Sequence, residues 1–184
     1  MKRSAYLLVL LAIAVGIYAG NAGYPALLDD ADRGHAIAAR ELRESGDWAV
    51  LHINGVRWLE KAPMHYWLVA ASYEIFGENE FATRLPTALA VTALALLLFL
   101  FGQEFFNEKA GFYAGLVLTT SVGTYIFTRS MIPEAIYALE FTAAFYFFLR
   151  AWTGSLSARA GWWGAAAMSW VSSSWGIQKG NWWS

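Results

Sequence analysis

Long apolar runs constrain this chain more than any other feature, because each approaches the length of a membrane-spanning helix. The clearest is the stretch 88–101, which is rich in leucine and contains no charged residue. A helix needs about 20 apolar residues to cross a bilayer. Over the chain 58% of residues are hydrophobic and 15% are charged, whereas a soluble domain has about 25% charged residues. The sequence therefore predicts an all-α membrane protein, a multi-span helical bundle with a long outer loop containing interfacial helices.

Five spans are predicted. The first follows Met1-Lys2-Arg3, and a cleaved signal peptide is its alternative, because small residues follow at 19–23. The run is longer than the usual signal core of about 7–15 residues, and further spans follow, which favours an uncleaved helix. The positive-inside rule then places the loop after it on the outer side. The predicted spans are 5–24, 84–102, 110–127, 136–149 and 162–175, with the outer loop at 25–83.

The outer loop is the most polar part of the chain, and it carries its own structural signals. Asp32 is a candidate N-cap for an amphipathic helix over 32–44, and Gly46 stands where that helix would stop. An Asn54-Gly55 pair predicts a short hairpin. The aromatic stretch 63–76 predicts a second interfacial helix, because Trp and Tyr favour the headgroup layer.

Three acidic residues, Asp29, Asp30 and Asp32, follow the first span. Crowded carboxylates at a bilayer boundary repel one another, so a cation or a proton is expected nearby. The alternative is a solvated turn in which Asp32 only caps the following helix.

A second cluster is Glu60-Lys61-Ala62-Pro63, directly before the aromatic stretch. An ammonium group at headgroup depth suits a lipid phosphate. A lysine that extends to the interface beside an ion-pairing neighbour is the equal alternative.

The third cluster lies in the short outer turn 128–134. Arg129 is a candidate phosphate ligand and Glu134 a candidate for the same outer cavity as the aspartates; anchoring at the membrane boundary is the alternative. Glu140 is different, because it falls inside a predicted span. A carboxyl there is expected to face the interior of the bundle.

Several function classes are excluded or unsupported. The net charge of −1 gives no basis for nucleic-acid binding, and the absence of cysteine excludes disulfides and thiolate metal sites. The three histidines, His35, His52 and His65, do not have HExxH spacing, and there is no glycine-rich phosphate loop or GxSxG motif.

Taken together, the chain resembles the integral-membrane GT-C glycosyltransferases, and within them the dolichyl-phosphate-mannose protein mannosyltransferase and lipid A aminoarabinose transferase types. The likeness extends more weakly through the fourth span. Residues 1–168 are thus expected to be the N-terminal part of such a domain, and the tail 169–184, where serines and tryptophans break the apolar run, to reflect a truncation or a frameshift. The likeness is carried by AIAARELRESGDW (36–48), Asn54-Gly55, Glu60-Lys61-Ala62-Pro63, Tyr66-Trp67-Leu68 and FGENEFATRLP (76–86).

The resemblance implies a mechanism. A sugar on a polyprenyl phosphate is transferred on the outer face to an acceptor hydroxyl, which belongs to a lipid, a glycan or a protein. An aspartate at the end of the first span acts as general base. Lys61 matches the family lysine that contacts the phosphate, Glu60 matches a residue that can hold a divalent metal of unknown identity, and Glu134 falls where a second acidic residue is often placed.

The sequence departs from the family pattern at the base. The usual Asp-Glu pair would fall on Ala31-Asp32, so either Asp30 or Asp32 takes the role, or the site is altered. The expected location is the inner membrane of a bacterium with the active loop outside. The rival hypotheses are a non-catalytic membrane protein, such as a transporter fragment or a partner-binding subunit, and an inactive truncated glycosyltransferase.

Overall fold

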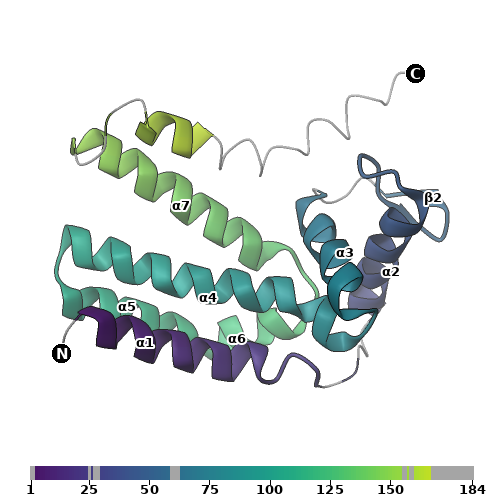
Figure 1. Ribbon diagram of the computed structural model, residues 1–184, viewed down its shortest axis with the longest axis horizontal. Coiled ribbons are helices and arrows are strands. Elements are labelled where there is room, and N and C mark those ends of the chain that lie inside the picture. Colours follow the sequence, from purple (N-terminus) through teal and green to yellow (C-terminus); the bar gives the residue numbers. More distant parts are fainter. Residues whose placement is uncertain are drawn as a thin grey trace.

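The computed structural model describes residues 3–24, 26, 30–58, 63–154, 157 and 160–166, with the side chains of residues 30–32 left aside. It is built from helices and one two-stranded hairpin (Figure 1). In order the elements are α1 (Arg3–Ala14), the π-helix η1 (Val15–Ala19), α2 (Asp30–Ser45), β1 (His52–Ile53), β2 (Val56–Arg57), α3 (Met64–Phe76), α4 (Glu80–Phe105), α5 (Glu108–Thr120), α6 (Val122–Arg129) and α7 (Glu134–Trp152).

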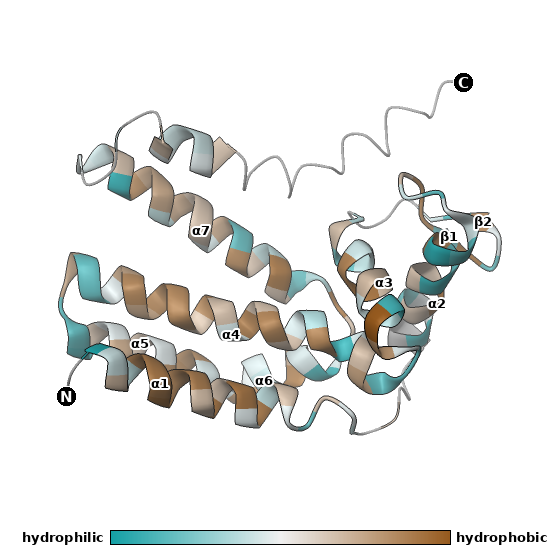
Figure 2. Ribbon diagram, viewed as in Figure 1, coloured by the Kyte–Doolittle hydropathy of each residue, from teal (hydrophilic) through white to brown (hydrophobic). Residues whose placement is uncertain are grey.

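The molecule has two parts. Helices α1, α4 and α5 lie side by side, α7 crosses α4 on its other side, and α2, α3 and the hairpin gather at one end of this bundle (Figure 1). Apolar residues dominate α1 and α4, whereas α2 is mostly hydrophilic (Figure 2). The amphipathic and charged segment of the sequence therefore forms a separate unit at the end of an apolar bundle.

Helix α4 is the centre of the bundle and begins four residues before the predicted span. Asn79 is its N-cap, and its side-chain oxygen accepts a hydrogen bond of 2.8 Å from the Ala82 amide. Among the described helices, α4 is the one long and apolar enough to cross a membrane unaided, and α5 with α6 would make a second such span. The predicted five-span topology therefore stays a prediction.

The predicted third span is not one straight helix. It is divided at Ser121, whose backbone is extended, and α5 and α6 meet there at 51°. Hydroxyl groups before the break compete with the helix for backbone carbonyls, because Thr119 and Thr120 donate to Gly115 and Leu116. The predicted span over 110–127 therefore contains a bend at Ser121, and whether α5 and α6 cross a membrane as one span stays a prediction.

The other predicted boundaries shift by a few residues. The first helical segment ends at Ala19 rather than Tyr24, and α7 extends the predicted fourth span to 134–152. Residues 160–166 are helical, while the rest of the predicted fifth span and the tail 169–184 lie outside the described residues. Glu140 is buried in the bundle, as predicted.

The unit formed by α2, the hairpin and α3 lies within the predicted outer loop and is called the outer unit below; its structure follows the sequence closely. Helix α2 stops at Ser45 before Gly46, which has a positive φ of 68°. The hairpin turns at Asn54 and Gly55, both with positive φ, which matches a type I′ turn. The Glu41 carboxylate accepts hydrogen bonds of 2.6 and 3.1 Å from the amides of these two residues, so α2 holds the hairpin directly.

Helices α4 and α5 approach closely because glycines face each other across their interface. A Cβ atom on Gly102 would lie 2.5 Å from Gly111 Cα, and one on Gly115 would lie 2.9 Å from the carbonyl oxygen of Ala95. The pair Gly111 and Gly115 has the four-residue spacing that lets membrane helices approach at short distance.

Replacing Gly102 with alanine is therefore expected to destabilise the bundle by about 2 kcal/mol, because the clash with backbone outweighs the gain in helix propensity. Thermal unfolding in detergent measures the effect. Gly123→Ala is the matched control: its Cβ would meet only a side-chain oxygen at 3.7 Å. Equal melting temperatures for the two variants would contradict the close-packing interpretation.

Candidate functional site

A buried arginine joins three segments where the outer unit meets the bundle. Arg84, near the start of α4, is 2% exposed. Its Nε donates a hydrogen bond of 3.1 Å to the carbonyl oxygen of Arg129 and its Nη1 one of 3.2 Å to that of Ala22. Because both acceptors are backbone atoms, Arg84 fixes the chain path after η1 and at the end of α6 relative to α4.

Arg129 continues this connection. Its Nη1 donates to the carbonyl oxygens of Asn21 and Tyr24, the latter at 2.6 Å, and its guanidinium lies 4.7 Å from the ring centroid of Tyr125. Its Nη2 is buried without a hydrogen-bond partner within the described ranges. Arg129, the predicted phosphate ligand, thus holds the chain after η1 in place. Its phosphate role stays a prediction, and Nη2 is the nitrogen available for it.

The turn after Arg129 belongs to the outer unit. Met131, which is 1% exposed, lies in one apolar cluster with Leu42 of α2 and with Tyr66 and Val69 of α3. The third predicted cluster is therefore joined through one core to the helix that begins at Asp30 and to the helix that follows the Lys61 segment.

Some of the remaining predicted site residues lie within the described part of the chain, and others lie outside it. Helix α2 begins at Asp30, so Asp32 lies within its first turn and the interpretation of Asp32 as N-cap was wrong. The side chains of Asp30 and Asp32, and the whole of Glu60 and Lys61, lie outside the described residues. Glu134 is exposed at the first turn of α7, where a carboxylate suits the helix dipole.

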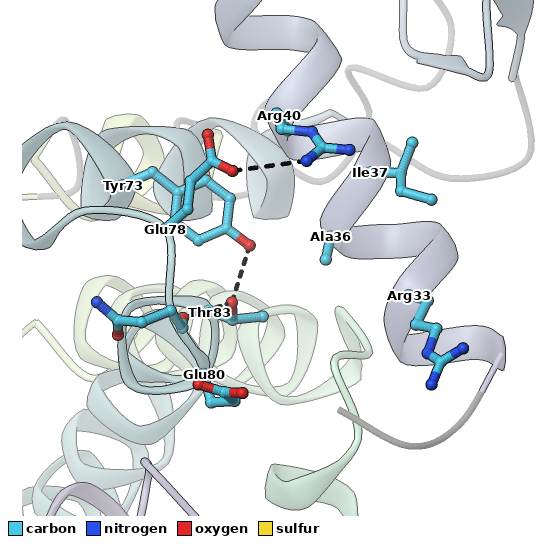
Figure 3. A pocket seen from close by; sticks show the side chains of 9 residues that line it. Arg33, Ala36, Ile37, Arg40, Tyr73, Glu78, Glu80 and Thr83 are labelled. Atoms are coloured by element: carbon cyan, nitrogen blue, oxygen red, sulfur yellow. Dashed lines mark hydrogen bonds and ion pairs between the residues drawn. The ribbon is translucent and has the colours of Figure 1, made fainter. Parts of the chain in front are cut away.

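A polar pocket of about 360 Å³ opens beside the first turns of α2. Figure 3 shows Arg33 and Arg40 of α2 on one side and Tyr73, Glu78 and Thr83 on the other. The Tyr73 and Thr83 hydroxyls are 2.8 Å apart, and Arg40 lies 3.8 Å from Glu78. Such a set of hydroxyls and both charge types suits a hydroxylated or zwitterionic group.

Two histidines are buried between α2 and α3. His35 Nδ1 lies 2.6 Å from the Tyr66 hydroxyl, and the His35 and His65 rings are 6.5 Å apart. His65 is fully buried, and neither of its ring nitrogens has a hydrogen-bond partner in the part of the chain described. Burial, and secondarily the charge of His35, lowers the pKa of His65 to about 3.

Metal-binding geometry is absent from the described part of the chain, where no three His, Cys, Asp or Glu side chains lie close enough to hold an ion. Glu60 falls outside that part, so its metal role stays a prediction. Sequence reasoning missed Arg84 as a connecting residue. The sequence feature that could have identified it is its position directly before an apolar run, at the start of the predicted span 84–102. An unpaired charge there would be unfavourable.

Comparison with known proteins gives several relatives that share one description. The chain is 36% identical over 117 residues to an undecaprenyl phosphate-alpha-4-amino-4-deoxy-L-arabinose arabinosyl transferase of Shewanella sediminis, covering 61% of this chain and 21% of the relative. It is 32% identical over 129 residues to the transferase of the same description from Aeromonas hydrophila, covering 69% of this chain and 24% of the relative. The chain thus spans about a fifth to a quarter of the length of these relatives.

The crystal structure of ArnT from Cupriavidus metallidurans bound to undecaprenyl phosphate matches the fold with a TM-score of 0.80. The identity is 21%, and the match covers 93% of this chain and 33% of that one. Fold and sequence therefore define a helical membrane protein of the GT-C glycosyltransferase class. A family model described as dolichyl-phosphate-mannose-protein mannosyltransferase matches residues 60–173. The chain belongs to that family.

Replacing Arg84 with methionine is expected to destabilise the protein by about 3 kcal/mol, because two buried carbonyls lose a charged donor. Thermal unfolding in detergent measures this loss. Arg40→Met is the control: Arg40 forms ion pairs, but its side chain is 47% exposed, so its removal is expected to change stability by less than about 1 kcal/mol. A mild effect at Arg84 would contradict its connecting role.

The outer unit is expected to lose stability as the pH falls below about 6.5. His65 is neutral in the folded state down to a pKa of about 3, whereas its unfolded-state value is 6.5, so the unfolded state binds more protons in that window. At pH 5 the expected loss is about 2 kcal/mol relative to pH 7. Hydrogen exchange of α3 amides, corrected for intrinsic rates, measures it. In the His65→Leu variant this part of the pH dependence should vanish. An unchanged pH dependence would show that another group causes it.

Proposed function

We propose that this chain forms the donor-side part of a glycosyltransferase that moves a sugar from a polyprenyl phosphate to an acceptor hydroxyl. The relatives described as undecaprenyl phosphate aminoarabinose transferases support this reaction class. The acceptor is a lipid, a glycan or a protein, and the location is the inner membrane of a bacterium with the outer unit facing outward.

One observation carries the proposal. The shared core of Leu42, Tyr66 and Met131 joins three elements that contain or flank the predicted reactive residues. These elements are α2, which begins at Asp30, α3, which follows Lys61, and the turn between Arg129 and Glu134. Elements separated by about 100 positions in sequence thereby share one core at the end of an apolar bundle, where we propose that a lipid phosphate is presented.

The chemistry follows from these residue types. Asp30 or Asp32 removes the proton from the acceptor hydroxyl as that oxygen attacks the anomeric carbon. The bond from that carbon to the phosphate oxygen breaks, and the polyprenyl phosphate leaves with its negative charge. Lys61, with Nη2 of Arg129, stabilises that charge. Glu134 adds a second carboxylate to the same side. Glu60, which lies outside the described residues, is the proposed ligand of a divalent metal of unknown identity, which would add positive charge beside the leaving phosphate.

Replacing Lys61 with alanine is expected to lower the transfer rate at least about a hundredfold, because the leaving phosphate loses its counter-charge. The assay follows radiolabelled sugar from a polyprenyl phosphate donor, on a polypeptide of the relatives' length that carries these residues. Arg57→Ala is the control, because this cation is exposed on β2 of the same loop. Normal turnover by the Lys61 variant would refute the assignment.

Asp30→Asn and Asp32→Asn, made separately, are expected to have very different transfer rates. One substitution should lower the rate about a hundredfold or more, and the other should leave it nearly unchanged. The same transfer assay identifies the base. Asp47→Asn is the control, because its side-chain oxygen only accepts hydrogen bonds from the Ala49 and Val50 amides, which asparagine also does. If neither aspartate matters, the base mechanism is wrong.

A further inference from the structure

The hydroxyl of Tyr18 joins two helical segments at places where each departs from α-helical geometry. Tyr18 lies in the π-helix η1 and is 3% exposed. It donates a hydrogen bond of 2.8 Å to the carbonyl oxygen of Thr119, next to the break at Ser121. A π-helical turn bonds across five residues instead of four, is rare, and is frequent at functional sites. Irregularities in two distant parts of the sequence thus meet at one hydrogen bond.

This hydrogen bond stabilises the bend between α5 and α6. Thr119 is one of the last four residues of α5, whose carbonyls lack a partner within that helix. The Thr119 hydroxyl donates to the carbonyls of Gly115 and Leu116. In an unbroken helix the Thr119 carbonyl would accept from the amide of Gly123, four residues on. The bent arrangement gives it the hydroxyl of Tyr18 instead, where an apolar surrounding offers no water.

The other end of α6 is attached to the same N-terminal segment. Helix α6 lies beside the end of the N-terminal helix (Figure 1). Its last residue, Arg129, donates to the carbonyls of Asn21 and Tyr24. Two residues further on, Met131 lies in the core of the outer unit. The angle of α6 on α5 therefore sets the position of two connections to the outer unit: the chain that leads to α2 and the turn that enters its core.

We propose that Tyr18 is a positioning residue. By holding α6 at its bent angle, its hydroxyl keeps the predicted base, Asp30 or Asp32, in the place where it acts. This role rests on the proposed function, because only the transfer reaction requires the base. Phenylalanine at position 18 would fill the same space beside Ala88 and Val91, but it would leave the carbonyl at the break without its donor.

The first measurement is hydrogen exchange of the α6 amides in Tyr18→Phe, on the polypeptide of the relatives' length in nanodiscs. These amides are expected to exchange about fivefold faster than in the unaltered protein, because the bent joint has lost its hydrogen bond. Tyr146→Phe is the matched control. Tyr146 is 8% exposed, and its hydroxyl donates to Glu104 at 2.5 Å between α7 and α4. This variant also loses one buried hydroxyl, but exchange in α6 should not change.

The second measurement is the transfer assay. Tyr18→Phe should lower kcat about tenfold with little change in KM, because a displaced base slows the chemical step and leaves donor binding intact. Tyr146→Phe should keep the unaltered kcat. Incorporation of 4-aminophenylalanine at position 18 supplies an N–H donor and should restore both α6 exchange and kcat. Incorporation of 4-methylphenylalanine, which has a similar size and no donor, should restore neither.

The outcomes are distinct. The proposal is overturned if α6 exchanges no faster in Tyr18→Phe than in Tyr146→Phe, or if it exchanges faster while kcat stays the same. Equal behaviour of the amino and methyl side chains at position 18 would also overturn it, and this pair replaces Tyr18→Phe if a circular dichroism melt shows that variant to be unfolded. The exchange measurement needs no substrate, so an error in the proposed reaction is seen separately, as normal turnover by Lys61→Ala.

Discussion

A single buried guanidinium joins three segments of the bundle at the end where the outer unit begins. Arg84 donates to backbone carbonyls that follow η1 and that end α6, and it does so from the first turns of the central helix. Carbonyls at the ends of helices need donors, and in an apolar surrounding no water supplies them. Arg84 therefore holds the segment after η1 and the end of α6 on α4, beside the outer unit, because one charge satisfies two chain ends at once.

Close packing supports this arrangement on the bundle side. Glycines 102, 111 and 115 let α4 and α5 approach at backbone distance, and Leu10 of α1 lies against Gly115 in the groove that this leaves. Helix α7 packs on the other side of α4, where Arg150 lies 3.0 Å from Glu104. The cavity that holds Glu140 lies between α7, α4 and α3, so its shape depends on contacts at both ends of the bundle.

Local sequence signals predicted the outer unit well and the bundle less well. The α3 helix and the Asn54-Gly55 hairpin are confirmed, because capping and turn preferences act over a few residues. The break at Ser121 and the early end of the first helix were missed, because a uniformly apolar run satisfies the length of a span whether or not the helix bends within it. The reactive roles of Asp30, Asp32 and Lys61 came from resemblance and stay predictions.

The sequence by itself determined that the chain is helical, that it is largely apolar, and that its charged residues concentrate in one loop, because these properties follow from composition and short-range pattern. The tertiary structure alone decided that Arg84 joins three segments, that Met131 enters the core of the outer unit, and that Glu140 and Ser72 line one cavity. These facts join residues tens of positions apart, and no local preference specifies which distant chain end a side chain will meet.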